Sequence, residues 1–208
     1  MKKRIVINSI RKKYNEKVVL NDLSYTFEQD YCYVIEGKSG IGKSTLLNAL
    51  SDYISIDDGD ISKNGLIVDY MFQEEMLFSN LTVRENLMLK LYAERSNSVY
   101  NFEQVTSKCI DILKKFDMDS MLERKVNSLS GGEKQRIILA GMILTEADVL
   151  LLDEPITSLD EHNREKFLEM IEQYIEGHII IIVSHIPLFL KHNMISLKMK
   201  DGKVYEKK

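Results

Sequence analysis

Apolar and polar residues alternate along the first part of the chain. Between residues 3 and 27, short runs at residues 4–7, 18–20 and 23–27 combine this alternation with β-branched and aromatic side chains. Such runs predict strands with one buried face, and their closeness in the sequence favours antiparallel pairing. We therefore expect a small antiparallel β-layer here, with Tyr14 in a polar turn within it.

Continuous apolar runs predict a second, more deeply buried set of strands. They lie at residues 31–36, 66–72, 149–152 and 178–183, and predicted helices at residues 44–50, 137–144 and 161–176 separate them. This order predicts an α/β core, in which helices flank a mostly parallel sheet. Residues 57–60 are expected to form a turn, and an Asp-Gly dipeptide at residues 201–202 predicts a closing hairpin.

Helical spacing of apolar residues replaces the strand pattern from Val83 to about Lys125. Val105, Cys109 and Ile112 follow this spacing, and the polar residues 95–101 predict a loop within it. Because no strand pattern occurs in this part, we expect a helical layer, at roughly residues 75–145, inserted into the α/β core.

A glycine-rich stretch joins the predicted strand at residues 31–36 to the predicted helix at residues 44–50. It has the pattern G-x-x-x-x-G-K-S of a phosphate loop, whose backbone N–H groups approach a polyphosphate without a Cβ in the way. Lys43 can reach the β- and γ-phosphates, and the Ser44 hydroxyl is placed to hold Mg²⁺. The candidate binding residues are Gly37, Lys38, Ser39, Gly40, Ile41, Gly42, Lys43, Ser44 and Thr45. This order of strand, loop and helix predicts a nucleoside triphosphate site.

Two carboxylates follow the buried run at residues 149–152. Ligands gather at the carboxyl ends of parallel strands, and neighbouring side chains on a strand point to opposite faces. We therefore expect Asp153 to hold Mg²⁺ through water, and Glu154 to orient or deprotonate an attacking water. His185 follows another buried strand, at the same expected edge of the sheet. A single histidine is more often structural, so its position alone does not assign its role.

A second anion site is predicted at the start of the helix near residue 131. Ser130 and Glu133 have the S-x-x-E spacing of a capping box. Gly131 and Gly132 fall in the first turn, where each costs about 1 kcal/mol of helix stability. Their presence makes sense if backbone N–H groups approach an anion closely, because a helix N-terminus attracts negative charge. Since the phosphate loop already supplies one site, the second suggests contact with the phosphates of another copy.

Composition and charge reduce the number of functional classes to which the chain can belong. The formal net charge of -4 gives no general attraction to nucleic acid, and no nucleic-acid partner is expected. The first residues turn polar too soon for a secretory signal, and the apolar runs are too short to cross a bilayer. We therefore expect a cytoplasmic protein that reaches a membrane only through a partner. Cys32 and Cys109 lack metal-type spacing and are expected to be reduced residues in or near the core.

Together these motifs resemble the ATP-binding subunit of ABC transporters. Residues 37–45 are similar to the Walker A loop, and residues 149–154 to Walker B followed by the catalytic glutamate. Residues 129–136 are similar to the signature sequence, which other phosphate-loop proteins lack. The chain departs from the family at three positions, Asp30 for a common glycine, Glu133 for glutamine and Pro187 for aspartate.

Four single residues extend the resemblance. Gln73 stands at the position of the Q-loop, and Asp160 stands in the D-loop. His185 stands at the switch histidine, and Tyr14 stands at the aromatic residue that stacks on adenine. The resemblance implies that Gln73 contributes to catalysis and to metal binding, and that it links the site to the helical layer. It also implies that His185 acts with Glu154 and Lys43 on the attacking water and the γ-phosphate.

The resemblance further implies an assembly. Two cassettes, identical or different, would close head to tail around two ATP molecules, with Mg²⁺ at each site. Each ATP would lie between Walker A of one cassette and Ser130, Gly131 and Gly132 of the other. Closure and hydrolysis would drive transport through transmembrane permease subunits. Binding to these subunits would make the chain peripheral on the inner face of the cell membrane. Residues 1–208 would form a single ABC ATPase domain, with the helical layer as its inserted subdomain.

The direction of transport is less constrained. The compact cassette, with its sequence at residues 78–86, resembles cassettes that serve export of peptides, bacteriocins or lipoproteins, and we expect export of a peptide, bacteriocin or lipophilic cargo. Importers share much of this pattern. The alternative is a soluble, non-transport ABC ATPase acting on DNA or ribosomes. DNA-repair members carry a long coiled coil before the signature, and ribosome-acting members carry two cassettes with a basic linker; this sequence shows neither.

Overall fold

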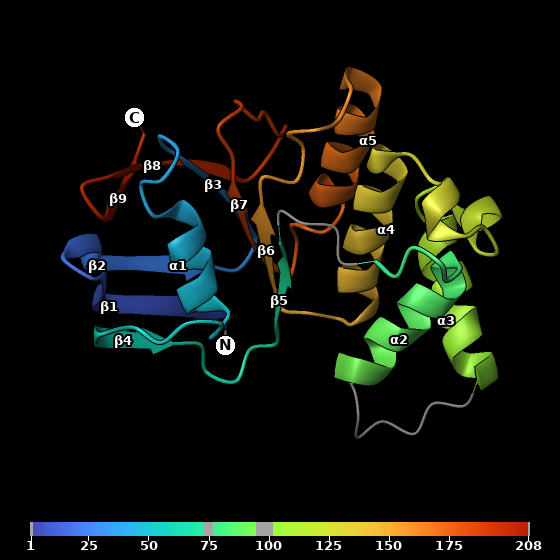
Figure 1. Cartoon of the computed structure of the whole chain (residues 1–208), viewed down its shortest axis with the longest axis horizontal. Coiled ribbons are helices and arrows are strands. Elements are labelled where there is room, and N and C mark those ends of the chain that lie inside the picture. Colours follow the sequence, from blue (N-terminus) through green and yellow to red (C-terminus); the bar gives the residue numbers. More distant parts are fainter. Residues whose placement is uncertain (1, 73–76, 95–101, 208) are drawn as a thin grey trace. The chain divides into compact units, whose positions relative to one another are not determined.

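The computed structural model describes residues 2–72, 77–94 and 102–207. It divides into two compact units (Figure 1). The first consists of Met1–Gln73, Asp148–Thr157 and Ile171–Lys208, and it contains every strand that the structure describes. The second consists of Glu74–Ala147 and Ser158–Met170, and it is helical.

One layer of the first unit is a three-stranded antiparallel sheet, in the order β2-β1-β4. Strand β1 (Arg4–Tyr14) and strand β2 (Lys17–Glu28) form one long hairpin. The three short runs predicted at residues 4–7, 18–20 and 23–27 are parts of this hairpin, so the antiparallel layer is confirmed. Tyr14 does not lie in a turn as predicted, because it is the last residue of β1 and pairs with Lys17.

The turn predicted at residues 57–60 is wrong, because β4 (Asp58–Ser62) pairs with β1 there. The acidic and glycine residues of this segment carry no alternating pattern, so the sequence gives no strand signal. Gly59 adopts φ +90°, and a Cβ there would lie 2.6 Å from backbone atoms of Ser9 and Ile10. Close approach of two backbones therefore forms this edge strand, together with a register shift in β1 between Asn8 and Arg11.

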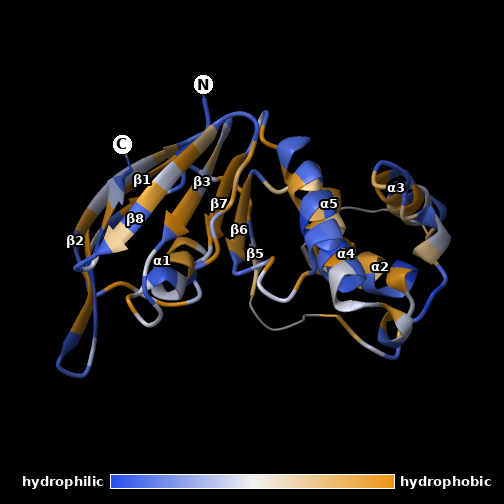
Figure 2. Ribbon diagram, turned by 90° about the horizontal axis from the view of Figure 1, so that it is seen from above, coloured by the Kyte–Doolittle hydropathy of each residue, from blue (hydrophilic) through white to orange (hydrophobic). Residues whose placement is uncertain are grey.

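The other layer is a six-stranded sheet, in the order β5-β6-β7-β3-β8-β9. Its strands are β3 (Tyr31–Glu36), β5 (Val68–Met71), β6 (Val149–Asp153), β7 (Ile179–Val183), β8 (Met194–Lys200) and β9 (Lys203–Glu206). All pairings are parallel except that of β8 with β9, which form the predicted Asp-Gly hairpin. Strands β6 and β7 are buried throughout and show as hydrophobic in Figure 2. The predicted α/β core with a mostly parallel sheet is therefore confirmed.

Helix α1 (Lys43–Leu50) and both sheets enclose the apolar core of the first unit. Leu46, Leu47 and Leu50 of α1 are fully buried in this core, which also includes residues of β1, β2, β3, β6, β7 and β8. The core fixes the helix directly after the glycine-rich loop, and thereby fixes the loop itself. Cys32 and Cys109 are both free and buried, as expected.

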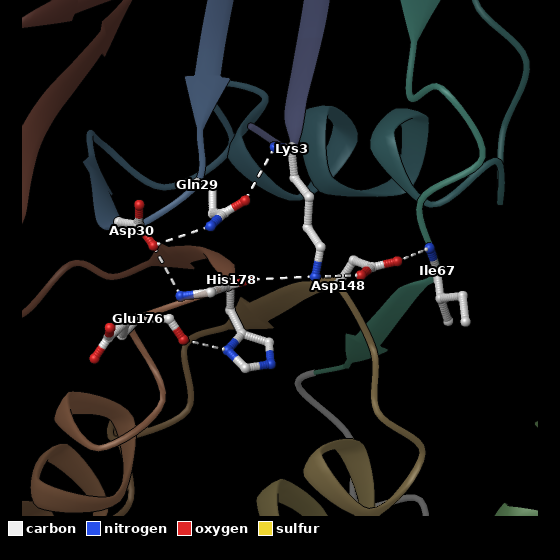
Figure 3. A network of polar contacts seen from close by, with 8 residues as sticks. Lys3, Gln29, Asp30, Ile67, Asp148, Glu176 and His178 are labelled. Atoms are coloured by element: carbon white, nitrogen blue, oxygen red, sulfur yellow. Dashed lines mark hydrogen bonds and ion pairs between the residues drawn. The ribbon is translucent and has the colours of Figure 1, made fainter. Parts of the chain in front are cut away.

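A polar network ties together the amino ends of the parallel strands (Figure 3). The carboxylate of Asp148, just before β6, lies 2.6 Å from Lys3 Nζ and accepts a hydrogen bond of 2.8 Å from the Ile67 N–H, just before β5. Lys3 Nζ also donates to the Gly177 carbonyl (3.2 Å), and the Gly177 N–H donates to Asp30 (2.8 Å). Asp30 adopts φ +73°, a left-handed conformation that glycine adopts without strain.

The described residues of the second unit include three α-helices and all but the end of a fourth. They are α2 (Val83–Glu94), α3 (Phe102–Lys114), α4 (Gly131–Leu144) and α5 (Glu161–Glu172). The helical pattern predicted up to Lys125 is too long, because α3 ends at Lys114 and Asp117 adopts φ +55°. Helix α5 ends at Glu172 rather than at Gly177. That the helical layer is an inserted subdomain of one domain stays a prediction.

No helix in the described part of the chain is long and apolar enough to span a membrane.

Candidate nucleotide-binding site

A cavity of about 510 Å³ lies in the first unit, at the carboxyl ends of β3, β6 and β7. Ligand sites in parallel α/β sheets occur at this edge. The cavity is lined by Tyr14, Val19, Ser39, Gly40, Gly42, Lys43, Ser44, Thr45, Glu154 and His185. The structure therefore brings together nine of the predicted site residues, from four separate parts of the sequence.

The backbone of the glycine-rich loop adopts a positive φ at two positions, and glycine accepts this without strain. Gly40 and Gly42 adopt φ +71° and +114°. A Cβ at Gly42 would lie 2.7 Å from Val19 Cγ1, so that the loop packs directly against β2. Helix α1 begins at Lys43, and no described side chain caps it. The N–H groups at its start are therefore available to an anion.

Lys43 is the positive charge of the cavity wall. Its side chain is 5% exposed, and its Nζ donates to the carbonyls of Gly37 (2.9 Å) and Lys38 (3.2 Å). These hydrogen bonds direct the Lys43 side chain back toward the glycine-rich loop. Gly37, Lys38 and Ile41 are not among the residues that line the cavity. Gly37 and Lys38 instead contribute the carbonyls that hold Lys43.

Asp153 lies at the end of β6 and is 5% exposed. Burial raises the pKa of its carboxyl group, while hydrogen bonds from Ser44 and Tyr70 act in the opposite direction. The Tyr70 hydroxyl of β5 donates to Asp153 Oδ2 over 3.2 Å. A carboxylate beside the Ser44 hydroxyl is a set of hard oxygen ligands that fits Mg²⁺. Among the described residues, no cluster of three or more His, Cys, Asp or Glu side chains could hold a metal alone.

Glu154 reaches the cavity by a different route from the one predicted. Strand β6 ends at Asp153, and Glu154 adopts φ +53° instead of continuing the strand. Its N–H donates to the Val183 carbonyl over 2.9 Å, which holds this left-handed turn against β7. Glu154 Oε2 lies 2.7 Å from His185 Nδ1 and accepts a hydrogen bond of 3.1 Å from the Thr157 hydroxyl. A turn, and not strand alternation, therefore separates the directions of the two carboxylates.

The start of α4 lies in the second unit and carries the predicted capping box. Ser130 Oγ accepts from the Glu133 N–H (3.2 Å), and Glu133 Oε2 accepts from the Ser130 N–H (2.7 Å). Arg124 Nη1 donates to the other carboxylate oxygen of Glu133 over 3.1 Å. The capping box is thus confirmed, and Ser130 and Gly131 remain exposed at the start of the helix.

Asp160, another predicted residue, does not line the cavity. Asp160 is exposed just before α5, where it accepts hydrogen bonds from Asn163, and these lower the pKa of its carboxyl group. Gln73 lies outside the described residues.

Comparison with known proteins decides the family. A family model described as "ABC transporter" matches residues 20–157, which are more than half of the chain. The chain belongs to the ABC transporter family. ATP-binding cassettes of this family are ATPases.

Curated relatives of this ABC cassette include both importers and an exporter. It is 34% identical over 185 residues to the thiamine import ATP-binding protein ThiQ of Aliivibrio fischeri, covering 83% of this chain and 77% of that protein. It is 31% identical over 206 residues to the macrolide export ATP-binding/permease protein MacB of Mannheimia succiniciproducens, covering 90% of this chain and 31% of that protein. The chain spans about half the length, 48%, of several further relatives that it matches.

The ABC cassette also matches solved structures in fold. The ATP-binding cassette MJ0796, solved as a dimer in a post-hydrolysis state with ADP and Pi, superposes with a TM-score of 0.84 at 24% identity. The match covers 98% of both chains. The likeness in fold therefore extends over both units of the chain.

The prediction from the sequence missed several residues of the cassette's site. Val19 lines the cavity beside Tyr14, but its sequence signal was only that of a strand. Tyr70 donates a hydrogen bond to Asp153, the last residue of β6, and Thr157 donates to Glu154, which follows it. Asn163 donates to Asp160. The spacing of Thr157 and Asn163, each three residues after its partner, could have indicated a local hydrogen bond. Nothing in the sequence places Tyr70 beside Asp153, because that contact depends on the pairing of β5 with β6.

Proposed function

We propose that this chain is the ATP-binding and ATP-hydrolysing subunit of an ABC transporter. The observation that carries the proposal is the meeting of a buried lysine, a glutamate and its histidine partner in one cavity. Lys43, Glu154 and His185 come from three separate segments, and all three line the space beside the glycine-rich loop. This arrangement suits binding of a triphosphate at one end and attack on its last phosphate at the other.

The loop and Tyr14 would hold the two ends of ATP. The N–H groups of residues 39–45 would bind the phosphates, and Lys43 would exchange its carbonyl partners for oxygens of the β- and γ-phosphates. The Tyr14 ring is 47% exposed at the cavity wall, where it offers a face for stacking of adenine. Its position on the rigid hairpin of β1 and β2 supports this role.

Ser44, Asp153 and the Q-loop residue Gln73 would hold Mg²⁺. The hydroxyl of Ser44 and the carboxylate of Asp153 are the two described groups that fit it. When bound, the metal ion supplies neutralisation of charge on the β- and γ-phosphates. The burial of Asp153 favours this use, because a nearby cation stabilises the charged form of a buried carboxylate.

Glu154 and His185 would act on the hydrolytic step. The Glu154 carboxylate would orient a water molecule and accept its proton as the oxygen attacks the γ-phosphorus. The bond from the γ-phosphorus to the bridging oxygen would break, so that ADP and inorganic phosphate leave. The contact of His185 with Glu154 Oε2 fixes the direction of this carboxylate. The imidazole would also hydrogen-bond the γ-phosphate.

The exposed start of α4 supports a second cassette as partner. Ser130 and Gly131 present a capped helix N-terminus, which suits the phosphates of ATP bound to another copy or to a related chain. Asp160 would lie at the same contact. Transmembrane permease subunits would then couple closure of the pair to transport, and would hold the chain at the inner face of the membrane.

We further propose export of a peptide, bacteriocin or lipophilic cargo. The alignment with the relative named as a macrolide exporter covers 90% of this chain, and the sequence at residues 78–86 resembles export cassettes. The relative named as a thiamine importer makes import the competing outcome.

The binding and hydrolysis proposal is tested with Lys43→Ala and a matched lysine variant. Lys203 lies on β9 outside the cavity, so that Lys203→Ala removes the same side chain elsewhere. Lys43→Ala should weaken ATP binding at least tenfold, because a hydrogen-bonded charge is worth roughly 1.5–3 kcal/mol. Lys203→Ala should bind ATP as the unmodified chain does. Equal ATP affinities of the unmodified chain and the two variants would contradict the assignment of the phosphate loop.

The transport proposal is tested by purifying the tagged chain from detergent-solubilised membranes and identifying its partners. A polytopic membrane protein would support it, and a vesicle assay with that complex would give the direction. Ribosomal proteins or DNA without a membrane partner would instead support the soluble, non-transport ABC ATPase.

A further inference from the structure

The two glycines at the start of α4 have different surroundings. A Cβ built at Gly131 would meet no atom of the other described residues within 4 Å, and Gly131 is exposed. A Cβ built at Gly132 would lie 2.4 Å from Cγ of Asn163 and 2.7 Å from its Cβ and Oδ1. Gly132 is buried under this side chain, whereas Gly131 is exposed. A described side chain of the same chain therefore requires glycine at residue 132, but not at residue 131.

Asn163 forms hydrogen bonds with Asp160, just before α5, and with Arg136 of α4. Its amide Nδ2 donates to Asp160 Oδ2 over 2.6 Å, and its backbone N–H donates to Asp160 Oδ1 over 2.9 Å. Its amide Oδ1 accepts from Arg136 Nη2, of the second turn of α4, over 3.4 Å. A single planar amide thus donates to the start of α5 and accepts from α4. These three residues and Gly132 all belong to the second unit.

The chemistry of the amide matters for this arrangement. An aspartate at position 163 could accept from Arg136, but it would place a second carboxylate against Asp160. An alanine would remove both amide contacts and would leave the space above Gly132 unfilled. Asparagine combines a donor, an acceptor and a length that fits over a glycine.

We infer that Asn163 is a positioning residue that fixes the start of α4 against the start of α5, so that Ser130, Gly131 and Asp160 face a second cassette as one surface. The inference rests on the proposed function, because it needs ATP-dependent pairing of two cassettes. It adds a reason for Gly132 that does not involve the partner's ATP. Gly132 is glycine because Asn163 of the same chain occupies the place of its side chain.

The experiment is a double-mutant cycle between Gly132→Ala and Asn163→Ala. Both changes are made in a Glu154→Gln parent, which should retain ATP and pair. Pairing is measured by analytical ultracentrifugation with ATP and Mg²⁺, and ATP binding to the separate chain is measured with a fluorescent ATP analogue. The first unit holds the ATP cavity, so all variants should bind the analogue as the parent does. Thermal melting with each variant reports on folding.

Asn163→Ala should weaken pairing by roughly tenfold while analogue binding stays unchanged. Gly132→Ala should weaken pairing more strongly, because its Cβ forces Asn163 away. The double variant should pair better than Gly132→Ala alone, since the contacts with Cγ (2.4 Å) and Oδ1 (2.7 Å) are then removed and only the Cβ of residue 163, at 2.7 Å, remains close to the added methyl. Gly131→Ala is the comparison: its effect on pairing should be the same with and without Asn163→Ala, because a Cβ at residue 131 has no contact with Asn163 or with another described side chain within 4 Å.

Two results would overturn the inference alone. Pairing of Asn163→Ala equal to that of the parent would mean that Asn163 only caps α5. An equal cost of Gly132→Ala with and without Asn163→Ala would mean that Gly132 serves another purpose. A parent that stays monomeric with saturating ATP and Mg²⁺ would overturn the proposed pairing of cassettes, and this inference with it.

Discussion

His185 Nδ1 lies 2.7 Å from Glu154 Oε2, and this contact joins the ends of two neighbouring parallel strands. Glu154 reaches it through a left-handed turn at φ +53°. A non-glycine residue in this conformation is strained, and such strain persists where the surroundings hold it. Here the Val183 carbonyl and the Thr157 hydroxyl do so. The carboxylate is thereby oriented before any ligand arrives.

Glu154→Gln should slow hydrolysis by roughly 10²–10⁴-fold, because the amide keeps the size of the side chain but cannot accept a proton. ATP binding should be retained. Phosphate release and binding of a fluorescent ATP analogue measure the two effects separately. Glu169→Gln makes the same change on the exposed face of α5 and should hydrolyse ATP at the unmodified rate. A Glu154→Gln protein as fast as this control would contradict the assigned role.

Tyr14→Ala should weaken ATP binding more than binding of inorganic triphosphate. Stacking of a base on an aromatic ring contributes about 1–3 kcal/mol, whereas the triphosphate has no base to stack. Competition of both ligands against a fluorescent ATP analogue gives the two affinities. Tyr205→Ala, on β9, removes an equally exposed tyrosine outside the cavity and is the control. Equal losses for ATP and triphosphate would remove the stacking role of Tyr14.

Tyr70→Phe should raise the Mg²⁺ concentration needed for ATP binding by roughly tenfold, because a partner that orients Asp153, the proposed metal-binding carboxylate, is lost. Binding of the nucleotide without Mg²⁺ should not change. Tyr25→Phe is a matched control, since the Tyr25 hydroxyl also donates to a carboxylate, that of Glu206, over 2.9 Å. Equal Mg²⁺ dependence of the two variants would show that Tyr70 only supports the sheet.

Asp148→Asn should lower the free energy of unfolding by roughly 1–3 kcal/mol, because the Lys3 ammonium loses a charged partner. Burial alone would raise the pKa of Asp148, but hydrogen bonds from Lys3 and Ile67 outweigh it and hold the pKa below its usual value. The stabilisation is therefore complete above the unfolded pKa of about 3.9 and is lost as the pH falls below it.

Urea denaturation at pH 7 and at pH 3 tests this prediction. The difference between the unmodified chain and Asp148→Asn should be large at pH 7 and small at pH 3. Asp201→Asn, in the exposed turn between β8 and β9, should change little at either pH. A difference between Asp148→Asn and the unmodified chain that is the same at both pH values would contradict the role of the charge.

The sequence predicted the parts of this molecule whose cause is local. The glycine-rich loop, the capping box at Ser130 and the buried runs of β6 and β7 are each encoded by neighbouring residues, and the structure places them as expected. Strand β4 was missed because backbone contact with β1, and not its own pattern, forms it. The same holds for Tyr70 and for the turn at Glu154, which depend on strands that are distant in the sequence.

The strand that leads into the phosphate loop lies between β7 and β8. A ribosome releases residues 31–36 long before it releases residues 179–200, which form both of these neighbours. The ribosome also releases Glu154 and His185 long after it releases the phosphate loop. During synthesis, β3 therefore has no partner strand in its sheet, and the ATP cavity is among the last features to form. A partly made chain carries the loop but cannot yet consume ATP.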